Sequence, residues 1–186
     1  TPLPNFSRPR SNGLIALSLD EGDTLIGTAI TKGDAEVMLF SSAGKAVRFN
    51  EEAVRPMSRT ARGVRGIRMP EGHHVVSLII PQENAVLLTA SENGYGKRIA
   101  MQCSERNGNL VTALQLFEGD EMMLISDKGT LVRTRTDEVS VLSRNTQGVR
   151  LIKLSQEDER LVGVERIAET DAEEVDGEEG SDEQGV

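Results

Sequence analysis

Short apolar runs, separated by polar turns that contain glycine, follow one another along most of this chain. The runs Val37–Phe40, Val86–Leu88 and Met122–Ile125 each lead into such a turn. The stretches Lys45–Phe49 and Leu131–Arg135, which follow two of the turns, are rich in β-branched residues and partly alternate apolar with polar positions. Short bounded runs of this kind are typical of strands, and no stretch shows a convincing helical period. The pattern predicts an all-β fold.

Two motifs recur in order along the chain. The first, S-x-x-G-x-x-x-R, occurs as SSAGKAVR (41–48), SENGYGKR (91–98) and SDKGTLVR (126–133). The second begins with glycine and continues with closely spaced apolar residues, as GLIALSL (13–19), GVRGIRM (63–69) and GVRLIKL (148–154). A polar turn and an apolar pair follow each copy of the second motif, the pairs being Leu25-Ile26, Val75-Val76 and Leu161-Val162. Ordered recurrence indicates an internal repeat.

The glycine spacings define the length of this repeat. The second motif precedes the first by 31 residues, and the first precedes the second by 19, so the period is 50 residues. Four short strands per 50 residues are typical of a propeller blade. We therefore expect residues 1–167 to form about three and a half four-stranded antiparallel blades, with one long loop per blade (49–62, 134–147). Because three blades seldom close a ring, we also expect further blades before Thr1.

One interval breaks the period. Gly94 and Gly129 are 35 residues apart, and IAMQC (99–103) matches the second motif without its glycine or the loop before it. By the spacing of the other copies, 16 residues are missing between Arg98 and Ile99. Either this copy lacks its loop, or the numbering runs on across a loop that the sequence omits, and we favour the second explanation.

The net charge of −9 is concentrated at one end of the chain. Residues 168–186 contain no lysine or arginine and hold nine acidic residues: Glu169, Asp171, Glu173, Glu174, Asp176, Glu178, Glu179, Asp182 and Glu183. The remainder balances 21 acidic against 21 basic residues. We expect 168–186 to be a disordered acidic tail, because it holds too few apolar residues to form a core.

Composition excludes several classes of site. The single Cys103 excludes a disulfide framework and a cysteine-rich zinc site, and we expect His73 and His74 to lie exposed in a turn. No long apolar run or signal segment is present, and a cytosolic location fits best. GYGKR is not a nucleotide-binding P-loop, since Ser91 replaces the first glycine and Arg98 follows the lysine. No catalytic constellation is apparent, including any based on Tyr95.

The arginines recur at equivalent positions of the repeat. Arg48, Arg98 and Arg133 end the three copies of the first motif, and further basic residues lie in the loops. If equivalent positions face the same direction, these basic residues form a band that could bind a curved polyanion. The alternative is a solvated surface on which they form local ion pairs. The candidate contacts are Arg8, Arg10, Lys45, Arg48, Arg55, Arg59, Arg62, Arg65, Lys97, Arg98, Arg133, Arg135, Arg144 and Arg150.

VMLFSSAGKAVRF, TASENGYGKR, MMLISDKGTLVRTR and SRNTQGVRLIKL, followed by LVGVERI and an acidic tail, together resemble the C-terminal domains of bacterial DNA gyrase A subunits. The resemblance covers essentially the whole chain and implies a β-pinwheel, a propeller-like disc. In that family the disc wraps duplex DNA around its basic perimeter, so that the holoenzyme, a type II topoisomerase, can introduce negative supercoils with ATP. The corresponding C-terminal domain of topoisomerase IV is the nearest competing family.

The resemblance also implies binding partners, and the sequence departs from the family in one motif. It implies duplex DNA, the gyrase breakage-reunion core and the ATP-hydrolysing gyrase partner protein as partners in an A2B2 holoenzyme of the bacterial cytoplasm and nucleoid, without a membrane. No cofactor is expected in this domain, because ATP and Mg2+ belong to other parts of the holoenzyme, as does the catalytic tyrosine. The family's glycine-rich basic box is missing here, so DNA contact carries over only to the basic residues named above. A protein-interaction propeller without nucleic-acid binding stays open as an alternative function.

Overall fold

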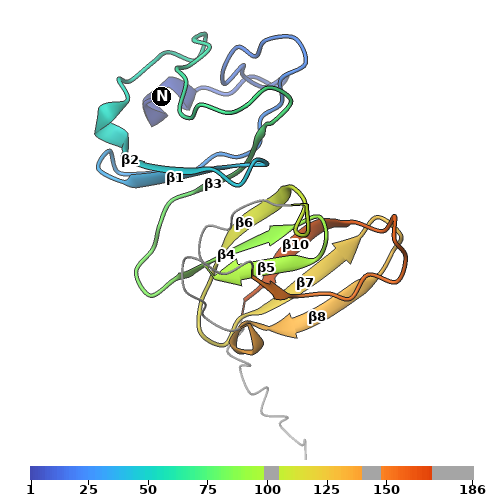
Figure 1. The fold of residues 1–186 in the computed structure, drawn as a ribbon. Coiled ribbons are helices and arrows are strands. Elements are labelled where there is room, and N and C mark those ends of the chain that lie inside the picture. Colours follow the sequence, from blue (N-terminus) through green and yellow to red (C-terminus); the bar gives the residue numbers. More distant parts are fainter. Residues whose placement is uncertain (99–104, 140–147, 169–186) are drawn as a thin grey trace, which may run out of the picture.

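Residues 1–98, 105–139 and 148–168 are described by a computed structural model of the chain (Figure 1). Within them, the first sheet has the order β2-β1-β3, from β1 (Glu36–Ser41), β2 (Ala46–Asn50) and β3 (Val75–Ile79). The second has the order β6-β4-β5-β9, from β4 (Val86–Ser91), β5 (Tyr95–Arg98), β6 (Leu110–Leu116) and β9 (Val149–Arg150). The third has the order β10-β7-β8, from β7 (Glu121–Ser126), β8 (Leu131–Arg135) and β10 (Leu161–Ile167). Three short 3-10 helices complete the elements, η1 (Leu3–Phe6), η2 (Glu51–Ala53) and η3 (Thr136–Glu138).

The sheets are antiparallel and lie side by side, as propeller blades do (Figure 1). Strand β6 packs against both β3 and β10, so the returning strands of the three repeats face one another on the inside. The all-β prediction is confirmed. Within the described residues only the middle sheet has the four strands expected of each blade, and the first and third have three.

The S-x-x-G motif forms the same turn in every sheet. In the middle copy the amide of Gly94 donates to the carbonyl of Ser91 at 2.9 Å, and the buried Ser91 hydroxyl donates to the carbonyl of Tyr95 at 3.2 Å. Gly94 has φ 76°, in the left-handed region that side chains disfavour. The corresponding amide-to-carbonyl bonds occur at Gly44–Ser41 and Gly129–Ser126. The serine and glycine therefore recur because this hairpin turn requires both.

Equivalent backbone hydrogen bonds join each sheet to the next. The amide of Leu110, at the start of β6, donates to the carbonyl of Ser42 in the first sheet at 2.8 Å. The amide of Leu161, at the start of β10, donates at the same length to the carbonyl of Glu92 in the second sheet. Since both donors and both acceptors occupy equivalent repeat positions, the repeat in sequence becomes a repeat of contacts between sheets.

Strand β9 completes the middle sheet, although it belongs to the following repeat. It pairs with β5 through Tyr95–Arg150 and Gly96–Val149. The amide of Leu151 donates to the carbonyl of Gly94 at 2.8 Å, and a Cβ built on Gly96 would lie 2.6 Å from Cγ of Leu151. The glycines of GYG therefore serve this close approach as well as the turn.

The segments 13–33 and 63–72 form no strand in the structure, although the apolar pattern predicts strands there. They contain large side chains that are strongly exposed, with Ile15 at 71% and Ile30 at 81%. A strand needs a continuous row of hydrogen bonds to a neighbouring strand. The first segment instead shows one backbone hydrogen bond to the loop just before the second segment, from the amide of Ser18 to the carbonyl of Ala61 at 3.3 Å. These apolar residues are therefore left at the surface.

The core consists of two clusters that meet around the middle sheet. One holds Leu88, Leu116, Met122, Leu124 and Leu161 among its buried residues, from the second and third sheets. The other joins the first and second sheets through Phe40, Ile79, Tyr95, Leu110 and Ala113. The middle sheet contributes to both clusters, so it is the most completely covered of the three.

Candidate nucleic-acid interface

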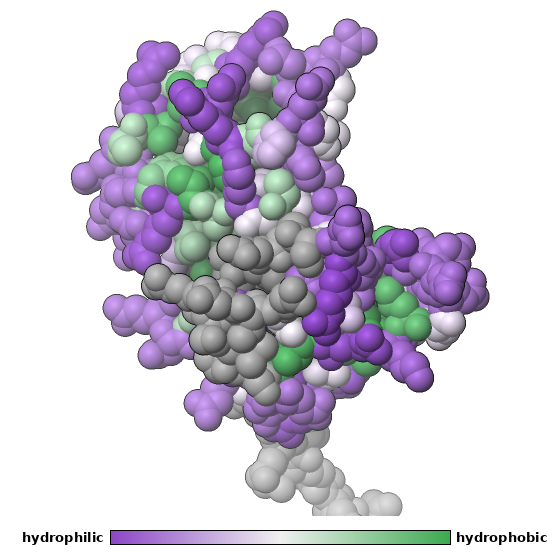
Figure 2. Space-filling view, in the orientation of Figure 1, coloured by the Kyte–Doolittle hydropathy of each residue, from purple (hydrophilic) through white to green (hydrophobic). Residues whose placement is uncertain are grey.

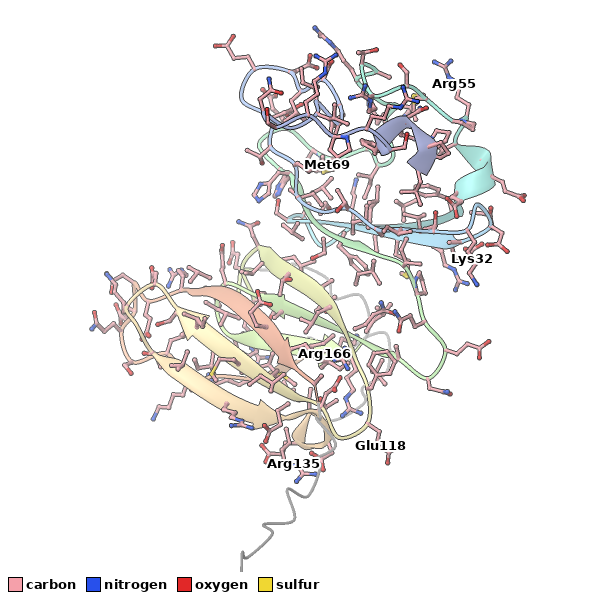
Figure 3. All side chains as sticks on the ribbon, turned by 180° about the vertical axis from the view of Figure 1, so that it is seen from behind. Lys32, Arg55, Met69, Glu118, Arg135 and Arg166 are labelled. Carbon is pink, nitrogen blue, oxygen red and sulfur yellow. The ribbon has the colours of Figure 1, made fainter. Side chains whose placement is uncertain are left out.

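Five of the candidate cations are exposed and form no ion pair, side-chain hydrogen bond or ring contact within residues 1–98, 105–139 and 148–168. They are Arg8, Arg10, Lys45, Arg55 and Arg65, and we call them the unpaired set. Arg55 follows η2 and lies at the outer end of the N-terminal part of the molecule (Figure 3). Unpaired guanidinium and ammonium groups in water are available to phosphate without the loss of an existing ion pair.

The arginine that ends the first motif is already paired in the two outer sheets. Nε of Arg48 on β2 donates to Glu36 on β1 at 2.9 Å, and Arg133 on β8 makes the equivalent ion pair with Glu121 on β7. The Arg48 guanidinium lowers the pKa of Glu36 below its ordinary value. Both pairs join residues 12 positions apart, at the same place in the repeat.

The equivalent arginine of the middle sheet has a different environment. Val86 stands where the outer sheets have glutamate, and the half-buried Arg98 donates instead to the carbonyl of Thr136, from the third repeat. Its neighbour Lys97 is fully buried on β5. Lys97 is therefore not on the exposed basic band that the sequence predicts, because it is completely buried.

Three other predicted cations hold loops in place. Arg59 donates to the carbonyl of Ile15 at 3.1 Å, and its guanidinium lies 6.0 Å from the centre of the Phe6 ring. Arg62 pairs with Asp20 at 2.5 Å. Arg135 pairs with Asp137 at 3.2 Å, at the end of the molecule opposite Arg55 (Figure 3). The predicted basic residues are thus distributed over the length of the arc rather than gathered in one patch.

Arg150 and Arg106 both approach the single tyrosine. Arg150, on β9, donates to the Tyr95 hydroxyl at 3.1 Å, and Arg106 lies with its guanidinium carbon 4.8 Å from the ring centre. The sequence predicted Arg150 as a contact and missed Arg106. No repeat position could have revealed Arg106, because its counterparts in the other copies are acidic, Glu71 and Glu157.

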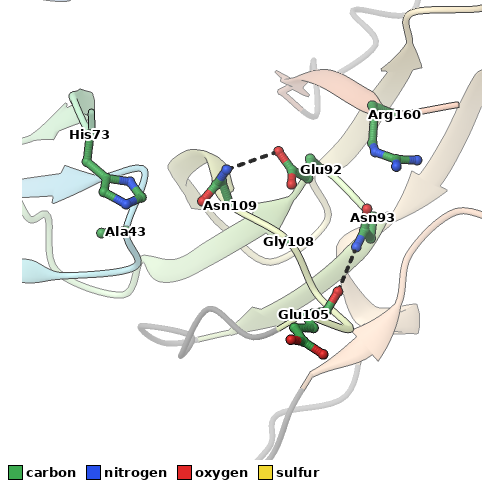
Figure 4. Close-up of a pocket in the computed structure, with 8 residues that line it drawn as sticks. All are labelled: Ala43, His73, Glu92, Asn93, Glu105, Gly108, Asn109 and Arg160. Atoms are coloured by element: carbon green, nitrogen blue, oxygen red, sulfur yellow. Dashed lines mark hydrogen bonds between the residues drawn. The ribbon is translucent and has the colours of Figure 1, made fainter. Parts of the chain in front are cut away.

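An open groove of about 500 Å³ lies where the turns before β3, β6 and β10 meet (Figure 4). Its lining includes His73, Glu92, Glu105 and Arg160, so charges of both signs are mixed there. Nδ1 of His73 is hydrogen-bonded to the Ser42 hydroxyl at 3.0 Å, and the ring is half-buried rather than freely exposed as predicted. In the described part of the chain no cluster of metal-binding side chains occurs.

Hydrophilic side chains project over much of the face shown in Figure 2, around smaller apolar areas. The predicted contact Arg144, Cys103 and the nine acidic residues of the tail lie outside the described residues. The gap predicted between Arg98 and Ile99 borders residues 99–104, which are also outside the described residues, and it stays a prediction. No helix in the described residues is long and apolar enough to cross a membrane.

Comparison with known proteins gives a consistent picture. The family described as "DNA gyrase C-terminal domain, beta-propeller" matches residues 2–32, 35–82, 85–101 and 120–168. The DNA gyrase A protein of Pseudomonas aeruginosa is 60% identical over an alignment that covers 91% of this chain and 20% of that protein. The chain thus spans about a fifth of the length of the curated relatives it matches.

Two solved structures share the fold. A structure of a DNA gyrase A C-terminal domain superposes with a TM-score of 0.73 at 29% identity, covering 84% of this chain and 59% of that one. The C-terminal domain of a DNA topoisomerase IV superposes with a TM-score of 0.79 at 18% identity, covering 89% and 57%. The second likeness supports the propeller fold alone.

Proposed function

Because the chain belongs to the DNA gyrase C-terminal domain family, we propose that it binds duplex DNA through its exposed cations and bends it along the outside of the arc. The observation that carries the proposal is the unpaired set, five exposed cations that form no ion pair, side-chain hydrogen bond or ring contact in the described residues. Their positive charge offers phosphates a partner at no cost in existing ion pairs.

Recognition runs through the phosphate backbone rather than the bases. The described residues hold no α-helix that could enter a major groove, and aromatic residues make up only 3% of the chain, too few for extensive base stacking. Exposed cations without an ion pair among the described residues, from Arg55 after η2 to Arg150 on β9, favour a duplex that follows the curvature of the arc, since bending brings more phosphates within reach.

In the holoenzyme, this wrapping supports the introduction of negative supercoils. The wrapped segment is presented to the breakage-reunion core of gyrase A, while ATP is hydrolysed by the gyrase B protein in an A2B2 assembly. The chain supplies the DNA-binding surface, and the cleavage and ATPase chemistry lies elsewhere in the assembly.

Two matched variants test the role of the unpaired set. One replaces Arg8, Arg10, Arg55 and Arg65 with glutamine, and the other replaces the ion-paired Arg48, Arg62, Arg133 and Arg135. Both remove four positive charges, so the long-range electrostatic change is the same. Fluorescence anisotropy with a linear duplex should show a loss of at least about tenfold in affinity for the first variant, and a markedly smaller loss for the second. Equal losses would contradict the special role of the unpaired set.

The alternatives differ in what they bind. A protein-interaction propeller would not retard a linear duplex in a gel, whereas the proposed function requires it. A topoisomerase IV domain would also bind DNA, but the 60% identity to a DNA gyrase A protein, compared with 18% to the topoisomerase IV structure, favours gyrase.

The acidic tail competes with DNA for the basic surface, since residues 169–186 carry nine carboxylates and no positive charge. Removal of these residues should tighten duplex binding. An unchanged affinity would leave the tail with a role in solubility alone.

A further inference from the structure

Tyr95 is fixed at the place where all three repeats meet. It is 8% exposed and packs in the cluster that holds Phe40 of the first sheet and Leu110 of the second. Its cross-strand neighbour Arg150 comes from the third repeat. The ring thus has neighbours from all three repeats, and its hydroxyl accepts a hydrogen bond from the exposed Arg150.

Two guanidinium groups converge on this ring from separate elements. Arg150 lies on the outer strand β9, with its guanidinium carbon 5.6 Å from the ring centre and one N–H donated to the hydroxyl at 3.1 Å. Arg106 comes from the turn before β6 and lies 4.8 Å from the same centre. Both side chains are exposed, whereas the ring between them is buried.

We propose that Arg106 and Arg150, oriented by Tyr95, form a two-guanidinium site for backbone phosphates of duplex DNA. This inference rests on the proposed function and extends it to the middle of the arc. A guanidinium has five N–H donors, so an arginine that stacks on a ring and bonds a hydroxyl can still donate to an oxyanion, and it has lost side-chain entropy before the ligand arrives. Tyr95 is buried and is a positioning residue, not a DNA contact.

The two arginines supply positive charge in the middle sheet, where the basic residues of the S-x-x-G-x-x-x-R motif are not exposed. In the middle sheet Lys97 is buried and Arg98 is half-buried and bonded to Thr136, so neither offers an exposed cation. The middle sheet also ends on β9, its outermost strand, which places Arg150 on the outside of the arc. A duplex that follows the arc would therefore meet Arg106 and Arg150 between the cations of the outer sheets.

The chain has one tyrosine and no tryptophan, which gives the site its own spectroscopic signal. Arg150 and then Arg106 lower the pKa of the Tyr95 hydroxyl below its ordinary value, because both stabilise the phenolate. Titration of the full 186-residue chain by ultraviolet absorbance should move toward the ordinary tyrosine value in Arg150→Gln and, to a lesser extent, in Arg106→Gln. A merely structural tyrosine would titrate identically in both variants and the parent, which would overturn the positioning role.

Duplex binding tests the site itself. In fluorescence anisotropy, Arg106→Gln and Arg150→Gln should each weaken binding about three- to tenfold and reduce the slope of log K against log salt by about 1. Arg160→Gln is the matched control, since Arg160 is an exposed arginine in the turn before β10 that does not contact the ring; its effect should stay within about twofold.

A double-variant cycle shows whether Tyr95 acts through the arginines. Tyr95→Leu should weaken binding in the parent and have little further effect once Arg106 and Arg150 are both glutamine. Tyr95→Phe, which keeps the buried ring and loses only the hydroxyl, should give a smaller loss that vanishes in Arg150→Gln. If Tyr95→Leu does not fold, Tyr95→Phe provides the test of whether Tyr95 acts through the arginines.

The outcomes separate this inference from the proposed function. If the parent chain does not bind duplex DNA, the proposed function is wrong and this site falls with it. If the parent binds and the Tyr95, Arg106 and Arg150 variants all bind within about twofold of it, only the two-arginine site is wrong.

Discussion

The middle sheet and the two outer sheets are built from the same repeat but are covered to different degrees. In β4 and β5 most positions are buried, whereas β2 and β8 contain no fully buried residue. The difference arises because β9, from the following repeat, covers the edge of β5, while β2 and β8 have no further strand beside them among the described residues. A repeat of this kind therefore depends on its successor for a complete sheet, and identical motifs acquire different roles according to their neighbours.

The largest effect is expected from truncation of a buried side chain in the middle sheet. Leu88 on β4 is fully buried, and Leu88→Ala should lower the free energy of unfolding by about 2–5 kcal/mol, because it leaves a cavity. Leu131→Ala on β8, where the side chain is 59% exposed, should change it by less than about 0.5 kcal/mol. Urea unfolding of the two variants measures both. Similar losses would contradict the unequal burial of the sheets.

A smaller but specific effect is expected where β9 approaches β5. Gly96→Ala places a Cβ against the side chain of Leu151, which directly follows β9, and should cost about 1–3 kcal/mol, because that packed side chain must shift to relieve the overlap. Gly163→Ala on β10 is the control, since no atom lies within 4 Å of a Cβ there. Its unfolding free energy should stay close to that of the parent. An unaffected Gly96→Ala variant would contradict the close approach of Leu151 to β5.

The third sheet should lose stability in acid through Glu159. This buried carboxylate accepts hydrogen bonds from Ser126 and the amide of Ser155, both at 2.5 Å, and from Thr130, and these bonds lower its pKa to about 2 from an ordinary 4.5. A lowered folded-state pKa stabilises the fold above pH 4.5, and this stabilisation is lost as the pH falls toward 2.

Thermal unfolding between about pH 7 and pH 2 measures this dependence. Glu159→Gln should unfold several degrees lower at neutral pH and should lose less stability on acidification than the parent. Glu157→Gln, an exposed glutamate of the same turn, should follow the parent at every pH. Parallel curves for the parent and Glu159→Gln would contradict the role of the buried carboxylate.

The smallest contrast concerns the arginine that ends the first motif. Arg133 forms a surface ion pair and is 60% exposed, so Arg133→Gln should cost less than about 1 kcal/mol. Arg98→Gln in the middle sheet should cost more, about 1–3 kcal/mol, because it removes a charge-assisted hydrogen bond and leaves the carbonyl of the buried Thr136 with the amide of Val139 as its donor. Chemical denaturation distinguishes them, and a greater cost at Arg133 would reverse the comparison.

Local rules made much of this fold predictable. The serine and glycine of S-x-x-G required a specific turn, and the runs before and after it form strands close to the expected bounds. The pairing of β9 with β5 of the preceding repeat was not predictable, because the partner of a strand depends on long-range contacts that no single motif encodes. It explains Gly96, whose lack of a side chain had no role within its own repeat.

The candidate interface was predictable in composition but not in exposure. Equivalent positions identified Arg48, Arg98 and Arg133, yet the structure pairs two of them with glutamates and half-buries the third. The sequence does contain the signal for pairing, since glutamate precedes arginine by 12 residues in the outer copies and Val86 replaces it in the middle copy. Lys97 could not be recognised as buried, because its burial depends on the packing around β5 and not on its position in the motif.

The salt dependence of duplex binding by the full chain tests the central claim most directly. If roughly six to ten phosphates are contacted, log K should fall with log salt with a slope of roughly −5 to −9, since each contact contributes about −0.9. The account predicts this steep fall for linear duplexes of unrelated sequence alike. A flat dependence, or no binding at low salt, would contradict a backbone-led DNA interface on this domain.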